Sequence, residues 1–199
     1  MALKTGFLWI LLAGVIYGAI HSAFASKTVK EWMITQFGLE NPNVYRFFFS
    51  LQSFFFTLVY VLLIFFLPDS TLYMIPFPWV FFTTFVEVTA VVFAVICMFQ
   101  TGPLSFFGLS AIIKHQTKPE ELKTDGFYGV MRHPLYVFSM LMIWLLPIMT
   151  WNILAFNIGA SLYMLVGAYV EERKLTRDFG EKYLEYKKLV PPFWPKLSH

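Results

Sequence analysis

The sequence predicts an all-α integral membrane protein with about five transmembrane helices, a C-terminal helical hairpin and an amphipathic cytoplasmic tail helix. Of the 199 residues, 58% are apolar and only 14% are charged, whereas soluble domains carry about 25% charged residues. The apolar residues are collected into runs of roughly 20, the length that crosses a bilayer core. Basic residues are distributed very unevenly between alternate connections. This composition excludes a disordered chain, a nucleic-acid-binding protein and a disulfide-rich secreted scaffold, since there is only one cysteine.

We expect residues 1–199 to form a single membrane domain, with three spans in residues 1–101. Residues 5–25 carry no formal charge, and because this run is longer than the apolar core of a signal peptide we expect a retained helix. The second span is predicted at residues 44–67. The third is predicted at residues 79–101, where Glu87 is the one charged residue.

Residues 102–199 are expected to supply a cofactor-binding loop, the hairpin and the tail. Pro147 and Asn152 interrupt the apolar stretch 135–170, which indicates two short helices of about 15 and 19 residues. The first would be only about 22 Å long, so it would have to tilt or thin the bilayer to span it. From residue 172 to Pro191 apolar residues recur every three or four positions, which predicts an amphipathic helix continuous with the last span. These residues are Leu175, Phe179, Tyr183, Tyr186 and Val190.

The basic residues set the expected orientation. With five spans, one side of the membrane receives residues 1–4, 68–78 and 147–151, whose one basic residue is Lys4. The other side receives fourteen of the fifteen Lys and Arg residues, and the positive-inside rule makes that side cytoplasmic. We therefore expect an extracytoplasmic N-terminus and a cytoplasmic C-terminus. The lipid bilayer is the expected partner, with no nucleic acid and no obligate protein partner evident.

A polar run at the end of the long cytoplasmic segment 102–134 is the first candidate for chemistry. Loops of this length are usually functional or disordered. This one leads into Gly126-Phe-Tyr128 and then Arg132-His-Pro-Leu-Tyr136. Pro134 favours the start of a helix, and a helix N-terminus favours an anionic group. We therefore predict a ligand site at the cytoplasmic end of the hairpin.

A second polar cluster, Glu171-Glu172-Arg173, follows the last span. A hairpin would return these residues to the level of Arg132, so we expect the two clusters to meet although they are about forty residues apart. A structural alternative remains open. Arg132 and Arg173 could pair with Glu171 and Glu172 and simply hold the hairpin closed.

These motifs together carry a family resemblance over about residues 100–195. Gly126-Phe-Tyr128, Arg132-His-Pro-Leu-Tyr136, a hairpin and then Glu171-Glu172 resemble the isoprenylcysteine carboxyl methyltransferase and phospholipid methyltransferase superfamily. Finer features are most similar to its bacterial methanethiol S-methyltransferase-like branch. They are His21-Ser22, Tyr45-Arg46, Phe107-Gly-Leu109 and Pro147-Ile-Met-Thr150.

The resemblance implies S-adenosylmethionine as the methyl donor, held at the cytoplasmic end of the last two spans. The implied cofactor-binding residues are Gly126, Phe127, Tyr128, Arg132, His133, Pro134, Tyr136, Glu171 and Glu172. Arg173 and Glu172 are the catalytic candidates, and Arg173 would stabilise an anionic acceptor. No metal is expected.

The acceptor expected from the resemblance is a small thiol such as methanethiol. Carboxyl methylation of a prenylated cysteine and N-methylation of a lipid amine are the alternatives. An apolar acceptor would enter between the spans, past His21, Glu87 and Gln100. Glu87 could instead be a buried structural carboxyl, and His21 an interfacial residue at a helix end. Two other classes stay open: a nicotinamide-dependent membrane reductase and a non-catalytic membrane protein.

Overall fold

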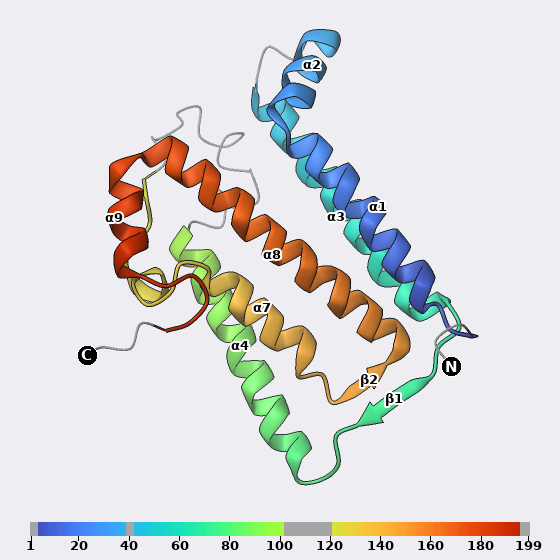
Figure 1. Cartoon of the computed structure of the whole chain (residues 1–199). Helices are drawn as coiled ribbons and strands as arrows, with labels where there is room; N and C mark the ends of the chain where they lie inside the picture. The colour runs from blue at the N-terminus through green and yellow to red at the C-terminus, as the bar shows by residue number, and fades with distance from the viewer. Residues whose placement is uncertain (1–3, 39–41, 102–120, 196–199) are drawn as a thin grey trace. The chain divides into compact units, whose positions relative to one another are not determined.

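A computed structural model describes residues 4–38, 42–101 and 121–195 (Figure 1). The Phe107-Gly-Leu109 feature and most of the predicted cofactor-binding loop lie outside these ranges. The described chain is mainly helical. Its elements are α1 (Phe7–Ala25), α2 (Lys27–Phe37), α3 (Pro42–Phe66), β1 (Thr71–Met74), α4 (Trp79–Thr101), the 3-10 turn η2 (Gly126–Gly129), α7 (Pro134–Trp144), β2 (Ile148–Thr150), α8 (Trp151–Phe179) and α9 (Glu181–Leu189).

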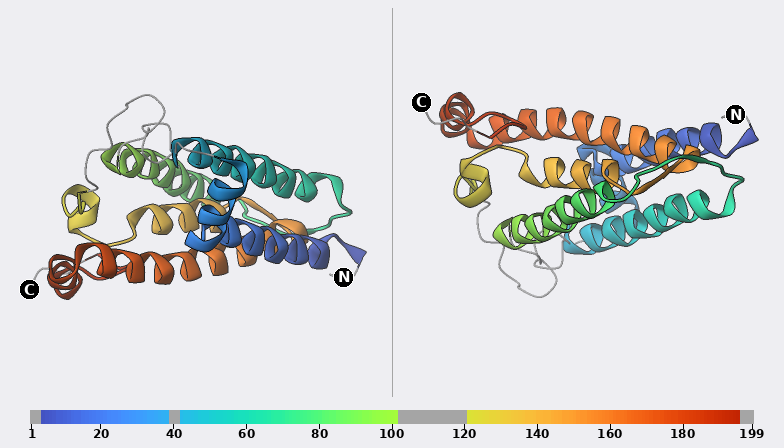
Figure 2. Two further views of the ribbon diagram at one scale, coloured as in Figure 1. Left: turned by 90° about the horizontal axis from the view of Figure 1, so that it is seen from above. Right: turned by 90° about the horizontal axis from the view of Figure 1, so that it is seen from below.

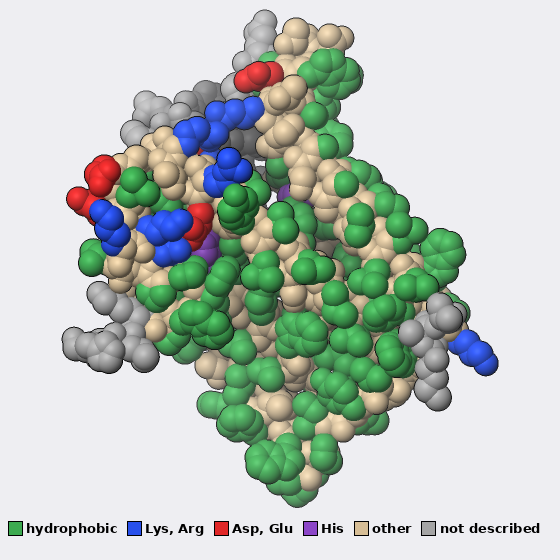
Figure 3. Space-filling view, in the orientation of Figure 1, with side chains coloured by type: hydrophobic (Ala, Val, Ile, Leu, Met, Phe, Trp, Pro, Cys, Tyr) green, Lys and Arg blue, Asp and Glu red, His purple; other side chains and the backbone are tan. Residues whose placement is uncertain are grey.

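Among the described residues, four helices are long and apolar enough to cross a membrane: Phe7–Ala25, Phe47–Phe66, Trp79–Thr101 and Trp151–Phe179. This confirms the predicted all-α membrane class. Helix α7 has only 11 residues, so five spans stay a prediction. Hydrophobic side chains cover much of the visible surface, whereas Lys and Arg side chains gather around α9 and the end of α8 that adjoins it (Figure 3). An apolar helix surface is what contact with lipid requires.

The predicted hairpin differs from the structure in its first helix. That helix ends at Trp144 rather than near residue 149, because Pro147 follows and residues 148–150 are extended. Strand β2 pairs with β1 in an antiparallel ribbon, Met74 facing Ile148 and Thr71 facing Thr150. Short ribbons have no strong sequence signal when both strands are apolar and only three or four residues long.

The tail is two helices rather than one. Helix α8 continues past residue 170 as predicted, but it ends at Phe179. Gly180 follows with φ +55°, a backbone conformation that favours glycine, and the chain turns there into α9. The predicted apolar stripe nevertheless packs as one cluster of buried and partly buried residues: Leu122, Leu175, Phe179, Tyr183, Tyr186 and Val190.

The chain divides into two compact units. The first holds α1, α2, α3, the ribbon and α8 up to Ala160, and its core is Ile10, Tyr60 and Ala155. The second holds α4, η2, α7, α8 from Ser161 and α9. Helices α4 and α7 run side by side in it (Figure 2). The prediction of one membrane domain stays a prediction.

Asn152 organises the end of the first unit at which α3 stops. Its side-chain amide donates to the carbonyls of Ile64, Leu67 and Pro68 at 3.2–3.3 Å. The Gly6 N–H donates to the Pro68 carbonyl at 2.6 Å. These carbonyls at the end of a helix need partners. The start of α1, the end of α3 and the start of α8 are therefore tied together at this end.

These contacts support the predicted topology, because three segments expected on one side of the membrane lie at one end of the first unit. Because the positive-inside rule assigns the side rich in Lys and Arg to the cytoplasm, a reporter fused to the C-terminus should read cytoplasmic, and one fused to the N-terminus extracytoplasmic. Protease protection in oriented vesicles is an independent measurement of the same property. Both termini on the same side would contradict the prediction, since that requires an even number of spans.

Candidate functional site

The two polar clusters meet in the second unit, as the hairpin predicts. The chain leaves the η2 turn and enters α7 at Pro134, the first residue of that helix. The side chains just before and after this point reach the last turns of α8, where Glu171 and Glu172 lie. The site is thus built by residues about forty positions apart in the sequence.

Arg132 is the buried centre of this arrangement. Its Nε and Nη2 atoms donate to Oε1 of Glu172 at 2.8 and 2.6 Å, and only 7% of the arginine side chain is exposed. Its Nη1 atom donates to the backbone carbonyls of Val190 (2.6 Å) and Lys187 (3.1 Å). The guanidinium therefore caps the C-terminus of α9 while it holds the last turns of α8.

Glu172 is fully engaged by protein groups. Besides Arg132, its Oε1 accepts from His133 Nε2 at 3.3 Å, and its Oε2 accepts from Lys187 Nζ at 2.6 Å. Its side chain is 16% exposed. The structural alternative raised by the sequence is thus correct for one of its pairs: Arg132 and Glu172 hold the hairpin and the tail together.

Glu171 has a different environment. One of its oxygens, Oε2, accepts from the Tyr136 hydroxyl at 3.1 Å and lies 3.7 Å from Nδ1 of His133. Its side chain is 46% exposed. The His133 and Tyr136 rings are stacked, with centroids 5.6 Å apart and planes 13° apart. A positioned but accessible carboxylate therefore stands beside an aromatic pair.

The segment that follows α9 lies against the residues just before α7. The N–H groups of Arg132 and His133 donate to the carbonyls of Pro191 and Pro192, both at 2.9 Å. The Tyr186 hydroxyl donates to the Tyr128 carbonyl, and η2 accordingly lies beside α9 (Figure 1). The pattern of α9 predicts its buried face, but nothing in the sequence assigns these backbone partners.

Burial raises the pKa of Tyr186 to about 12 and that of Tyr183 to about 12. A tyrosine with an ordinary pKa of about 10 is already protonated at physiological pH, and the raised pKa lets Tyr186 keep its donor proton to still higher pH. Lys187 and Tyr186 were not predicted as site residues. Spacing alone could have found Tyr186, because it lies three residues after Tyr183 on the predicted apolar face.

Position 126 favours glycine for two reasons: its backbone conformation and the close approach of Gln100. The φ of Gly126 is +59°, and a Cβ at this position would lie 2.2 Å from Nε2 of Gln100. Gln100 therefore lies against η2, and its Oε1 atom is buried with no hydrogen-bond partner in the described part of the chain. Sequence reasoning placed Gln100 in an acceptor channel. The structure brings Gln100 to the predicted cofactor motif, and its role in an acceptor channel stays a prediction.

Gly126→Ala should lower the free energy of unfolding by about 2–3 kcal/mol. About 1–2 kcal/mol comes from the left-handed backbone and about 1 kcal/mol from displacing the terminal amide of Gln100, which is the mobile end of that side chain. Gly38→Ala is the matched control, since Gly38 has φ +60° and no atom of the described residues lies within 4 Å of the added Cβ. Thermal unfolding should show the larger loss for Gly126→Ala, and Gln100→Ala should recover part of it. Equal losses at the two glycines would contradict this account.

Three other predicted residues have different surroundings. Arg173 is exposed, and its guanidinium carbon lies 5.7 Å from the ring centroid of Tyr169 on the same helix. Glu87 is half-buried in the middle of α4. His21 belongs to the first unit, where it lies 3.0 Å from the Ser53 hydroxyl. Arg173 directly follows Glu172 on α8, whereas Glu87 lies on α4.

Two other predicted residues, Pro134 and Phe127, contribute to the packing around the site. Pro134 is fully buried at the start of α7. The Phe127 ring packs against Phe93 of α4 and Phe138 of α7, with centroids 5.0 and 5.3 Å apart. Cys97 is buried in the same core, as an apolar residue. In the described ranges no group of three His, Cys, Asp or Glu side chains is placed to hold a metal ion.

Comparison with known proteins gives one family and several relatives. The family model described as phospholipid methyltransferase matches residues 79–182. Methanethiol S-methyltransferase of Crocosphaera subtropica is 34% identical over 111 residues, which are 54% of this chain and 44% of that protein. Methanethiol S-methyltransferase 1 of Bradyrhizobium diazoefficiens is 33% identical over 101 residues, or 49% of this chain and 35% of that protein.

A third relative is the nickel-cobalt-cadmium resistance protein NccN of Alcaligenes xylosoxydans. It is 38% identical over 84 residues, which are 41% of this chain and 39% of that protein. The matched region therefore spans less than half the length of each of these three relatives. No solved structure is significantly similar to the chain.

Proposed function

The chain belongs to the phospholipid methyltransferase family, and we propose that it is a membrane methyltransferase that transfers a methyl group from S-adenosylmethionine to a small thiol. The family supports the reaction, and the names of two relatives support the thiol. The single observation that carries the site assignment is the contrast between Glu171, half-exposed and positioned by a tyrosine, and Glu172, saturated by protein partners.

The residues present suit the donor. S-adenosylmethionine carries an ammonium group, a carboxylate, ribose hydroxyls and a sulfonium, and when bound it would supply an electrophilic methyl group. The Glu171 carboxylate suits the ammonium or a ribose hydroxyl. The Tyr136 ring suits a sulfonium, because a cation is attracted to an aromatic face. The buried Oε1 of Gln100 has no hydrogen-bond partner among the described residues, and it would accept a hydrogen bond from the donor.

We divide the predicted cofactor-binding residues into two groups. Glu171, Tyr136 and the η2 turn would contact the donor. Arg132 and Glu172 would act as positioning residues, since each guanidinium nitrogen and both carboxylate oxygens already have protein partners. His133 serves both groups, with Nε2 toward Glu172 and Nδ1 toward Glu171.

Catalysis would then depend mainly on positioning. Donor and acceptor must meet in line within about 3–3.5 Å, which can supply roughly 7–11 kcal/mol of the barrier. A thiol reacts as its thiolate, so its proton must leave to water or to a base before the sulfur attacks. Arg173 is the candidate cation for stabilising that thiolate, because its guanidinium is exposed on the turn of α8 that carries Glu171.

An acceptor panel tests the proposal. The full chain in nanodiscs is incubated with methyl-labelled S-adenosylmethionine and, separately, methanethiol, a prenylated cysteine or phosphatidylethanolamine. We expect label in dimethyl sulfide and loss of turnover in Arg173→Ala, whereas Glu87→Gln should keep donor affinity and most turnover. Label in the prenylated cysteine or the lipid alone would keep the reaction class and replace the acceptor. Label in none of the three would contradict the proposal.

A further inference from the structure

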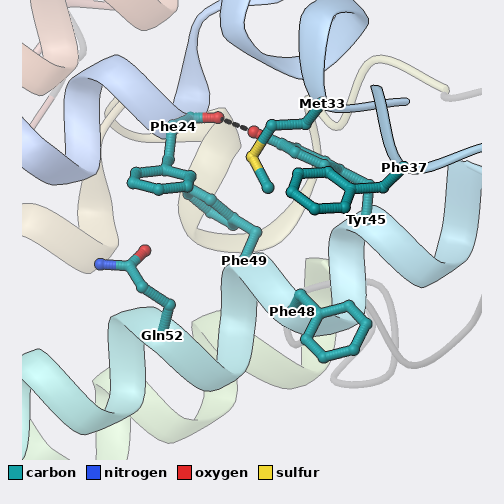
Figure 4. Close-up of a pocket in the computed structure, with 7 residues that line it drawn as sticks. All are labelled: Phe24, Met33, Phe37, Tyr45, Phe48, Phe49 and Gln52. Atoms are coloured by element: carbon teal, nitrogen blue, oxygen red, sulfur yellow. Dashed lines mark hydrogen bonds between the residues drawn. The ribbon is translucent and has the colours of Figure 1, made fainter. Parts of the chain in front are cut away.

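A second candidate binding site lies in the first unit, outside the residues that the family model matches. It is a pocket of about 510 Å³ between the end of α1, the helix α2 and the start of α3 (Figure 4). Ligand pockets are usually about 300–1,000 Å³. Its seven lining residues are Phe24, Met33, Phe37, Tyr45, Phe48, Phe49 and Gln52.

Local sequence features hold this pocket open. Ser26 ends α1 and caps α2, its hydroxyl accepting from the Val29 N–H at 3.3 Å. The Tyr45 hydroxyl donates to the Phe24 carbonyl, which ties the first turns of α3 to the last turn of α1. Helix α2 then lies across the gap and contributes Met33 and Phe37. The walls therefore come from three helices that are tied at their ends.

The residues that line the pocket favour an uncharged and mainly apolar ligand. Five of the seven residues are aromatic, one is a methionine, and none carries a charge. A charged group moved into such a pocket would lose its hydration with no opposite charge among these seven lining residues to pair with. A carboxylate or an ammonium is therefore a poor occupant, whereas a hydrocarbon chain is a good one.

Gln52 is the one lining residue with an amide side chain, and it favours a ligand that carries a polar group. Both atoms of its side-chain amide are buried, and neither has a hydrogen-bond partner within the described residues. Figure 4 shows this side chain reaching from α3 toward the side of the pocket where Phe24 lies. Leaving a buried polar group unpaired is costly. A hydroxyl or carbonyl on the ligand would satisfy it.

We propose that this pocket binds an uncharged single-chain amphiphile from the membrane, a long-chain alcohol or ketone, with its hydroxyl or carbonyl at Gln52. Helices α1 and α3 are both apolar enough to span a bilayer, so such a ligand reaches the pocket by partitioning into lipid. A phospholipid would bring a charged headgroup, which the lining does not match.

Photolabelling in nanodiscs of phosphatidylcholine tests the proposal. The probes are a dodecanol, a dodecanoate and a dodecane, each carrying one diazirine at the same carbon, and mass spectrometry locates the label. We expect dodecanol to label peptides within residues 24–52 more than either other probe. Gln52→Leu should lower dodecanol labelling roughly two- to twelvefold, the value of one neutral hydrogen bond, and should leave dodecane labelling unchanged.

Two further variants separate binding in the pocket from contact with lipid. Met33→Trp fills the pocket and should abolish dodecanol labelling there, whereas Phe55→Trp, on an exposed part of α3, should not. Thermal unfolding reports whether each variant folds, and Gln52→Leu should unfold no earlier than the parent because it removes an unpaired amide. Equal labelling by all three probes, or dodecanol labelling that survives Met33→Trp, would overturn the proposal.

Discussion

Arg132→Ala is expected to lower the free energy of unfolding by about 3–5 kcal/mol, the usual cost of removing one partner of a buried ion pair. The substitution removes hydrogen bonds to Glu172 and to the carbonyls of Lys187 and Val190. It leaves a mostly buried carboxylate with Lys187 and His133 as its remaining partners. It also uncaps the C-terminus of α9. Denaturant unfolding in detergent micelles, followed by circular dichroism, measures the loss.

Arg177→Ala is the matched control for that prediction. Arg177 lies on the same helix as Glu172 and pairs with Asp178, but more than half of its side chain is exposed. Exposed pairs contribute only about 0–1 kcal/mol. Arg132→Lys should fall between the two, since lysine keeps the charge but cannot bridge Glu172 and the two carbonyls at once. Equal losses in Arg132→Ala and Arg177→Ala would show that the pair does not hold the tail.

Glu171→Gln is expected to weaken S-adenosylmethionine binding roughly 10–150-fold while the protein stays folded. The reason is the loss of a charge-assisted hydrogen bond, worth about 1.5–3 kcal/mol, from a carboxylate that is positioned by Tyr136 yet half-exposed. Calorimetric titration of the donor into the reconstituted chain measures this affinity.

Two glutamate controls make the result specific. Glu185→Gln changes an exposed carboxylate on α9 and should leave both affinity and stability unchanged. Glu172→Gln removes the charge that Arg132 and Lys187 share, so its first effect should be on the unfolding midpoint. If Glu172→Gln lost donor affinity at unchanged stability while Glu171→Gln bound normally, the roles assigned to the two glutamates would have to be exchanged.

The sequence predicts the long helices well because hydrophobic length is a local property. The third span was expected at residues 79–101 and α4 has those bounds. The meeting of Arg132 with Glu172 could also be predicted, since any hairpin that turns near Pro147 brings them to one level. A contact between residues far apart in the sequence can be predicted when only one arrangement of the connecting helices is possible.

The different roles of Glu171 and Glu172 could not be predicted from the sequence. Glu171 and Glu172 are identical in type and adjacent in sequence, and they differ only through partners supplied by Lys187, His133 and Tyr136. The short ribbon and the bend at Gly180 were missed for a related reason. A pairing of three or four residues, or one glycine conformation, leaves no periodicity to read.

Thermal unfolding of the reconstituted chain with different cofactors tests the central claim most directly. S-adenosylmethionine and its demethylated product should raise the unfolding midpoint in a concentration-dependent way, because both bind the folded state only, and Glu171→Gln should reduce the shift. NADPH should leave the midpoint unchanged. A shift with NADPH and none with S-adenosylmethionine would contradict the account and favour a nicotinamide-dependent reductase.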